Sequence, residues 1–112
     1  MRLVEILFQF LVGHAVCDFV LQGEVMGSGK SRRKNLRAQH GPEFPPWYFW
    51  LLAHSLTHGG AVYLISGLWE LGALETVLHS IIDHMKCEQR ISFHQDQLLH
   101  IACKILYIAL LA

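Results

Sequence analysis

Four pairs of His and Asp side chains recur along the chain, and the two members of each pair stand four residues apart. The pairs are His14 and Asp18, His54 and His58, His79 and Asp83, and Asp96 and His100. Residues four apart lie one above the other on one helix face, so both side chains of a pair can reach one point. Helical bundles build metal sites in this way, from inward side chains of facing helices. We therefore expect these eight residues to bind metal.

The number and type of these ligands indicate a dinuclear site. A single pair of this kind is more often an ordinary buried polar contact, but the fourfold repetition favours a shared site. Eight nitrogen and oxygen ligands exceed what one tetrahedral ion takes, whereas two ions with a bridging carboxylate leave open positions for water or substrate. We expect two divalent metal ions. Mixed imidazole and carboxylate ligation suits zinc, our first choice, and also manganese or iron.

Four helices must position these pairs. No segment shows the sustained polar and apolar alternation of a strand, so we expect an all-α fold, a four-helix bundle in which the chain forms one domain, 1–112. The helices are expected at about 3–22, 47–69, 71–86 and 95–112, with a long loop over about 23–46. A rise of about 1.5 Å per residue then places the four pairs in one layer, within a turn or two of one another.

The composition favours a membrane protein. Apolar residues make up 53% of the sequence and charged residues 16%, against roughly 45–50% and about 25% in ordinary soluble domains. We therefore expect a transmembrane bundle, with 47–69 as the strongest candidate span because tryptophans stand near both of its ends. The same aromatic side chains would also suit a soluble core. Glu75 and Lys104 interrupt the third and fourth segments, which are less suited to crossing.

Positive charge is concentrated in the connections between helices. Lys30, Arg32, Arg33, Lys34 and Arg37 all lie in the loop 23–46. By the positive-inside rule we expect the basic loops to face the cytoplasm from a bacterial inner membrane, with membrane lipid as a partner. The formal net charge is zero, so no specific nucleic-acid partner is expected. The oligomeric state stays open.

The apolar run at the N-terminus is interrupted by polar residues. Glu5, Gln9, His14 and Asp18 lie within it, and no small-residue cleavage site follows. We therefore expect a helix of the folded protein rather than a signal peptide.

Four blocks of the sequence carry a resemblance to a known family. The blocks are HAVCDFVLQ (14–22), HSLTH (54–58), HSIIDHMK (79–86) and FHQDQLLH (93–100). In this order, with a long loop after the first, they resemble an uncharacterised family, a domain of unknown function, of short multi-helix proteins from bacteria and phages. A looser similarity is to membrane-bound metal-dependent hydrolases. One departure is Cys17, where the family more often has glycine, and this would change helix packing there.

The resemblance implies a small membrane-embedded metalloprotein and gives no established substrate. It carries Gln22, Lys86 and Gln97 over as motif positions. We expect Lys86 and Gln97 to serve catalysis, with Lys86 stabilising negative charge on a phosphate. Glu75 and His84 are expected to face solvent near helix ends rather than to carry protons.

Two familiar motifs are excluded. The segment GSGKS (27–31) looks like part of a phosphate-binding P-loop, but Glu24 stands where the first glycine must be, and a helix rather than a strand precedes it. The block HSLTH lacks the glutamate of a zincin helix. We expect the basic segment, with His40, to be a solvated loop.

Three functions remain open at this point. The leading hypothesis is a membrane-embedded dinuclear metal-dependent hydrolase that acts on a small phosphorylated substrate, a phosphoester or related ester, near the cytoplasmic face. The second is a non-enzymatic metal-binding membrane protein or a phage-type host-interaction protein. The third is a di-iron lipid oxidase. The segments 61–68 and 105–112 are almost wholly apolar, which argues against a polar path for ion transport.

Overall fold

The computed structural model describes residues 2–112, and over this range the chain forms helices and connections without a strand. Four long helical segments dominate it: α1 (Arg2–Ala15), continued by the π-helical turn η1 (Val16–Val20), α4 (Trp47–Ser66), α5 (Trp69–Cys87) and α6 (Phe93–Leu111). Two short helices, α2 (Glu24–Gly29) and α3 (Leu36–His40), lie between the first and second of these. The prediction of an all-α fold is confirmed.

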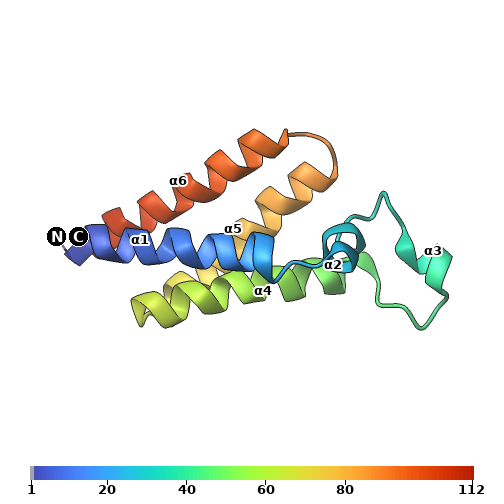
Figure 1. Cartoon of the computed structure of the whole chain (residues 1–112), viewed down its shortest axis with the longest axis horizontal. Coiled ribbons are helices and arrows are strands. Elements are labelled where there is room, and N and C mark those ends of the chain that lie inside the picture. The colour runs from blue at the N-terminus through green and yellow to red at the C-terminus, as the bar shows by residue number, and fades with distance from the viewer. Residues whose placement is uncertain (1) are drawn as a thin grey trace.

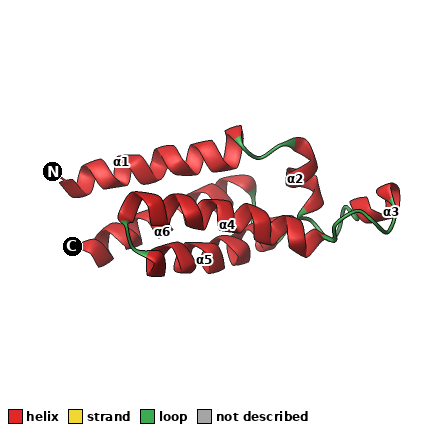
Figure 2. Ribbon diagram, turned by 90° about the horizontal axis from the view of Figure 1, so that it is seen from below, coloured by secondary structure: helices red, strands yellow, loops and turns green. Residues whose placement is uncertain are grey.

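The four long helices pack in a ring, in which α1 and α5 each contact both α4 and α6. The two termini lie together at one end of the molecule, and α2 and α3 lie at the opposite end (Figure 1). Seen from below, α3 projects beyond the ends of the long helices (Figure 2). The molecule is elongated, with extents of 50 × 25 × 22 Å. Side chains on the inner faces of all four long helices can therefore meet along a common axis.

The connection between α1 and α4 differs from the predicted loop. We expected a solvated loop over 23–46, and the structure places α2 and α3 there. The helix α2 contacts α4, and this approach depends on Gly29, because a Cβ at this position would lie 3.0 Å from the ring of Trp50. Six residues are too few for a helix that is stable alone. Tertiary contact rather than local propensity therefore explains α2.

Local signals set where the long helices begin and end. Pro46 is the N-cap of α4, a position at which the missing amide hydrogen costs nothing. The same helix ends at Gly67, whose φ of 75° is in the left-handed region that glycine adopts without strain. Ser92 and Gln95 form a capping box at the start of α6. This cap explains why α6 begins at Phe93, earlier than predicted.

Two glycines allow α4 and α5 to approach closely. A Cβ on Gly59 would lie 2.0 Å from Oγ1 of Thr76 and 2.6 Å from the carbonyl oxygen of Gly72, so a larger residue could not be accommodated without moving one helix. The neighbouring His58 stacks on His79 of α5, with the ring centroids 3.7 Å apart. Close packing through the glycines thus brings imidazoles of two helices into contact.

The bundle has a polar interior and an apolar surface. Its hydrophobic core cluster is small and consists of Phe10, Val62, Leu71 and Tyr107. Histidine, aspartate, glutamate and lysine side chains make up most of the other buried positions. Conversely, large apolar side chains are exposed on every long helix, among them Phe8, Leu64, Val77 and Leu98. Soluble domains also expose apolar residues, but charged groups are rarely this common in their interiors.

One helix in the described part of the chain, Arg2–Val20, is long and apolar enough to cross a membrane by length and composition alone. The expectation that 47–69 would be the strongest candidate is wrong by this measure, because polar residues such as His54, Ser55 and His58 interrupt α4. A single helix of this kind is weak evidence for a membrane protein. Transmembrane insertion of the whole bundle therefore stays a prediction.

Candidate metal centre

The structure brings the eight paired residues together in one layer inside the bundle. The segment α1–η1 and the helices α4, α5 and α6 contribute two each, and none of the eight is more than 8% exposed. Their imidazole rings stack across helices, with the centroids of His79 and His100 4.2 Å apart. The expected juxtaposition is therefore present in the fold, and metal binding by these residues stays a prediction.

The π-helical turn η1 carries Asp18 into this layer. The amide of Leu21 donates to the carbonyl oxygen of Val16 at 2.8 Å, one residue further along the chain than in an α-helix. Such turns are rare and occur frequently at functional sites. The carboxylate of Asp18 is buried, and its Oδ1 lies 3.1 Å from Nε2 of His54 on α4, within hydrogen-bond distance.

Asp18, His54, His58 and His79 form the first candidate ligand group. Each offers one ligand atom, and these atoms all lie within 4.8 Å of one another. Nε2 of His58 lies 3.3 Å from Oδ1 of Asp18, so α4 presents two imidazoles to one carboxylate. Three imidazoles and one carboxylate make a complete tetrahedral ligand set for an ion such as zinc.

Asp83, Asp96 and His100 form a second candidate ligand group, whose ligand atoms also lie within 4.8 Å of one another. The second group shares no residue with the first, so each group can hold an ion of its own. Three protein ligands leave a coordination position open, which is the arrangement of catalytic rather than structural sites. A third combination, Glu75 with His79 and His100, overlaps both groups.

Several buried atoms of this layer lack a hydrogen-bond partner. Among residues 2–112, neither ring nitrogen of His79 or of His100 has one, nor does Oδ1 of Asp96. Nε2 of His100 lies 3.2 Å from that Asp96 oxygen, but the two are not aligned as a hydrogen bond. A buried polar group without a partner costs about 1–3 kcal/mol, and such groups are few in folded proteins. Coordination of divalent cations would satisfy the Asp96 oxygen and the lone-pair nitrogen of each ring, so the donor set fits a metal centre.

Gln97 links the two ligand groups. Its Nε2 donates to Oδ2 of Asp18 at 2.9 Å and to Oδ2 of Asp96 at 3.0 Å. Its Oε1 lies 3.0 Å from Nε2 of His14, which belongs to neither ligand group. Partners of metal ligands fix ligand orientation. The structure thus places Gln97, predicted to be catalytic, where it would position carboxylates of both groups.

Two lysines approach Asp83. Lys86, predicted to be catalytic, lies at the edge of the layer, with Nζ 3.9 Å from Oδ1 of Asp83 and a side chain 28% exposed. Lys30 is buried and donates to Oδ2 of Asp83 at 2.6 Å and to Oε1 of Gln22 at 2.5 Å. Sequence reasoning missed Lys30 because it assigned the segment to a solvated loop. Its partner Gln22, a motif position, was the available signal.

A buried ion pair adjoins the layer. Glu75 is 0% exposed, and its two carboxylate oxygens accept from Nζ of Lys104 at 2.9 and 2.5 Å. The expectation that Glu75 faces solvent is therefore wrong. Glu75 stands four residues before His79, and Lys104 four residues after His100, so both lie on the helix faces that carry the pairs. Extending the four-residue spacing by one step would have found this ion pair.

Basic residues and a pocket mark the end of the bundle near α2 and α3. The guanidinium of Arg32 donates to the carboxylate of Glu88, and this hydrogen bond holds the pKa of Glu88 below its ordinary value.

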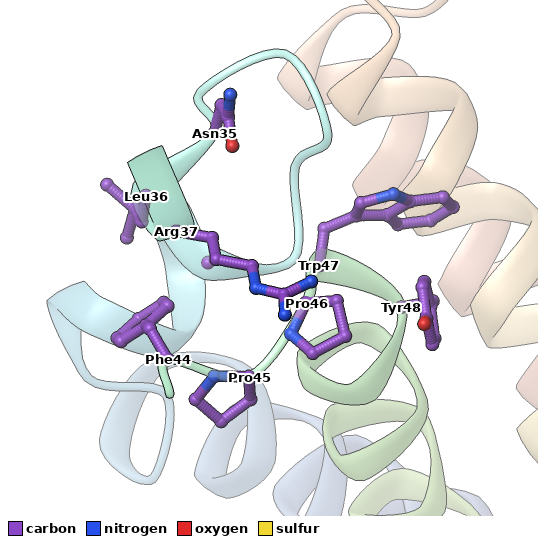
Figure 3. A pocket seen from close by; sticks show the side chains of 9 residues that line it. Asn35, Leu36, Arg37, Phe44, Pro45, Pro46, Trp47 and Tyr48 are labelled. Atoms are coloured by element: carbon purple, nitrogen blue, oxygen red, sulfur yellow. The ribbon is translucent and has the colours of Figure 1, made fainter. Parts of the chain in front are cut away.

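His84, also expected to face solvent, is half-buried. Its ring stacks on that of Trp47, with the ring centroids 5.2 Å apart. In a pocket of about 250 Å³, the side chain of Arg37 extends towards Pro46 and Trp47 (Figure 3).

Comparison with known proteins identifies the family. The family described as "Protein of unknown function (DUF3307)" matches residues 6–112. Neither the comparison with curated proteins nor that with solved structures gave a match. The matched range contains all eight paired residues together with Lys30 and Gln97. Because the match covers nearly the whole chain, this protein belongs to the DUF3307 family.

Proposed function

We propose that this protein is a membrane-embedded hydrolase with a dinuclear metal centre, acting on a phosphoester or a related ester. The observation that carries the proposal is the set of ring nitrogens of His79 and His100 that have no partner within the described chain. Two divalent ions would take the lone pair of one nitrogen in each of these rings, supply a hydroxide nucleophile at neutral pH and polarise a substrate oxygen. Zinc is the first choice, and manganese or iron would suit the same ligands.

The two ligand groups suit different tasks. The first group offers four ligands from η1, α4 and α5, which fill the coordination of a tetrahedral ion. The second group offers three ligands, Asp83, Asp96 and His100, and so leaves room for water and a substrate oxygen. In this proposal the ion of the second group binds the substrate. Gln97 orients one carboxylate of each group through its hydrogen bonds to Asp18 and Asp96.

Placement in a bilayer is supported by the distribution of side chains. Leu64 of α4 is 83% exposed and Leu98 of α6 is 66% exposed, while the eight paired residues and the Glu75–Lys104 ion pair are buried. Helices of 19 or 20 residues, such as α4, α5 and α6, reach about 30 Å, the thickness of the hydrocarbon core. The basic residues at the α2–α3 end favour the cytoplasmic side of a bacterial inner membrane for that end.

A non-enzymatic metal-binding protein is the second candidate. It is favoured by the completeness of the first ligand group, because closed four-ligand sites are usually structural. A transporter is disfavoured by the hydrophobic core cluster at the end near the termini. There the rings of Phe10 and Tyr107 meet edge to face, with centroids 6.0 Å apart, and no polar path continues through such a contact.

Turnover of model substrates tests the proposed activity. Protein loaded with zinc or manganese should hydrolyse at least one of p-nitrophenyl phosphate, bis-p-nitrophenyl phosphate and a phosphatidic acid in mixed micelles. His58→Ala and Asp96→Ala, one from each ligand group, should each lower the rate by 100-fold or more, by analogy with roughly 10²–10³-fold losses at other catalytic electrostatic sites. The exposed His40→Ala is the matched control and should keep full activity. No turnover of any substrate by the metal-loaded protein would leave only the metal-binding function.

Extraction of bacterial membranes tests the location. A bundle that spans the bilayer should stay in the pellet after washing with alkaline carbonate and should leave it only with detergent. Release by carbonate alone would show that the exposed apolar faces are covered by something other than lipid tails.

A further inference from the structure

We infer that Lys30 binds a phosphate group of the substrate at the metal centre, so that the substrate class is an anionic phosphoester rather than a neutral ester. This inference rests on the proposed dinuclear site and adds to it the residue and the charge that select the substrate.

Lys30 reaches the layer from outside the four long helices. It is the C-cap of α2, and only 1% of the residue is exposed. Its Nζ donates to Oδ2 of Asp83, the same oxygen that lies 3.7 Å from Nε2 of His54 and 3.8 Å from Nε2 of His79. The ammonium group therefore holds the carboxylate oxygen of the second ligand group that lies nearest to imidazoles of the first.

The ammonium group of Lys30 retains a donor for a ligand. A lysine ammonium has three N–H donors, and within residues 2–112 those of Lys30 bond to Gln22 and Asp83. Lys104, the other buried lysine, places its ammonium on both oxygens of Glu75 and is 5.8 Å from the ring centroid of Tyr107. Lys30 is thus the buried lysine that adjoins the open, three-ligand group.

The charge balance of the interior calls for an anion. The layer and its adjoining ion pair hold four carboxylates, of Asp18, Glu75, Asp83 and Asp96, and two ammonium groups, of Lys30 and Lys104. With neutral histidines this is a formal charge of −2, and two divalent ions would change it to +2. Excess buried charge is costly unless it is compensated. A hydroxide on the metals would lower this charge to +1, which a phosphodiester anion would compensate and a neutral carboxylic ester would not, and a phosphate dianion in place of the hydroxide would compensate the whole +2.

The approach to the layer from the α2–α3 end is also suited to anions. Residues next to Lys30 in sequence include Arg32, Arg33 and Lys34, and all three are exposed. Clustered positive charge raises the local concentration of anionic ligands and their rate of association. The residue before Lys30, Gly29, packs close to the ring of Trp50, where an added Cβ would lie 3.0 Å from the ring. The exposed basic residues of this end thus stand close in sequence to the one buried lysine that contacts the second ligand group.

Binding of inorganic phosphate to the zinc-loaded protein in detergent micelles tests this inference by calorimetry. Lys30→Met keeps the length of the side chain and removes its charge, and it should weaken phosphate binding by about 10- to 100-fold, the range for a lost charge-assisted hydrogen bond. The matched control Lys34→Met, an exposed lysine of the same segment, should change the affinity less than about threefold. Equal phosphate affinity in Lys30→Met and the unaltered protein would overturn the inference.

A second measurement on the unaltered chain covers the case in which Lys30→Met fails to fold. In protein with ¹⁵N-labelled lysine, the side-chain ammonium signal of Lys30 should shift when phosphate is added to the zinc-loaded form. The variants Lys34→Met and Lys86→Met assign two of the four lysine signals, and of the two signals that remain, those of the buried Lys30 and Lys104, only one should shift. Absence of a Lys30 shift at saturating phosphate would refute the assignment.

Zinc content, measured on the same samples, distinguishes failure of the dinuclear metal site from failure of phosphate binding by Lys30. A protein that binds two ions but no phosphate retains the metal centre and loses this inference. A protein that binds one ion or none contradicts the dinuclear site, and it also removes the excess positive charge from which phosphate binding is inferred.

Discussion

Removal of the buried charge of Lys104 should destabilise the fold far more than removal of the whole ion pair. The perturbation is Lys104→Met, which leaves the carboxylate of Glu75 buried at 0% exposure without its cation. Loss of one partner of a buried pair costs about 3–5 kcal/mol, because an uncompensated charge is left in a poorly solvated interior. For a chain of 112 residues this corresponds to a fall in melting temperature of about 13–21 °C, given an unfolding entropy of about 2.1 cal/mol/K per residue.

The double variant Glu75→Met with Lys104→Met tests whether the loss of stability comes from the unpaired charge. Two apolar side chains of similar volume avoid the desolvation of both charges, so the double variant should recover most of the lost stability. The assay is thermal unfolding followed by far-ultraviolet circular dichroism in one detergent. Lys86→Met, which removes a partly exposed lysine 3.9 Å from Asp83, is the control and should cost less than about 1 kcal/mol. A double variant as unstable as the sum of the single variants would refute this view of the ion pair.

Three further predictions concern packing and the ligand network. Gly59→Ala should lower the free energy of unfolding by about 1–3 kcal/mol, because its Cβ would overlap Thr76. Gly60→Ala, whose Cβ meets nothing within 4 Å, should be neutral or slightly stabilising in the same melting assay. Equal effects of the two variants would contradict the close α4–α5 contact. Gln97→Leu should weaken zinc affinity by about 10- to 100-fold, as measured by competition with a chelating dye, without changing the number of ions at saturation; an unchanged affinity would show that Gln97 does not position Asp18. Zinc at 100 times its dissociation constant should stabilise the apo-protein by about 2.7 kcal/mol per site, and a melting temperature unaffected by zinc or by EDTA would argue against binding to the folded state.

The layer of paired residues was accessible from the sequence because it depends on local geometry. A spacing of four residues fixes a helix face whatever the neighbours are. The common depth of His54, His58 and Asp83 followed from the predicted helix ends and the alternating chain direction of the helices, at about 1.5 Å per residue. The same face continues beyond the pairs, to Glu75 in α5 and to Lys104 in α6. Those two residues were missed because the spacing was read as pairs rather than followed along each helix.

Lys30 could not be placed from the sequence by the same reasoning. Its burial depends on the docking of a six-residue helix, α2, against α4 through Gly29 and Trp50. Such contacts join segments far apart in the chain and leave no periodic pattern. The π-helical turn at Asp18 was also unpredicted, because a single inserted residue in a helix changes the hydrogen-bond ladder without a clear signal in composition.

Metal content per chain tests the central claim most directly. Protein purified without chelators or a histidine tag, then measured by elemental analysis, should contain two divalent ions per chain. His58→Ala should lose the ion of the first ligand group and Asp96→Ala that of the second, so each variant should retain about one, while the exposed His40→Ala should retain both. A native protein without metal, which also takes up none after incubation with zinc, manganese or iron, would contradict the metal centre.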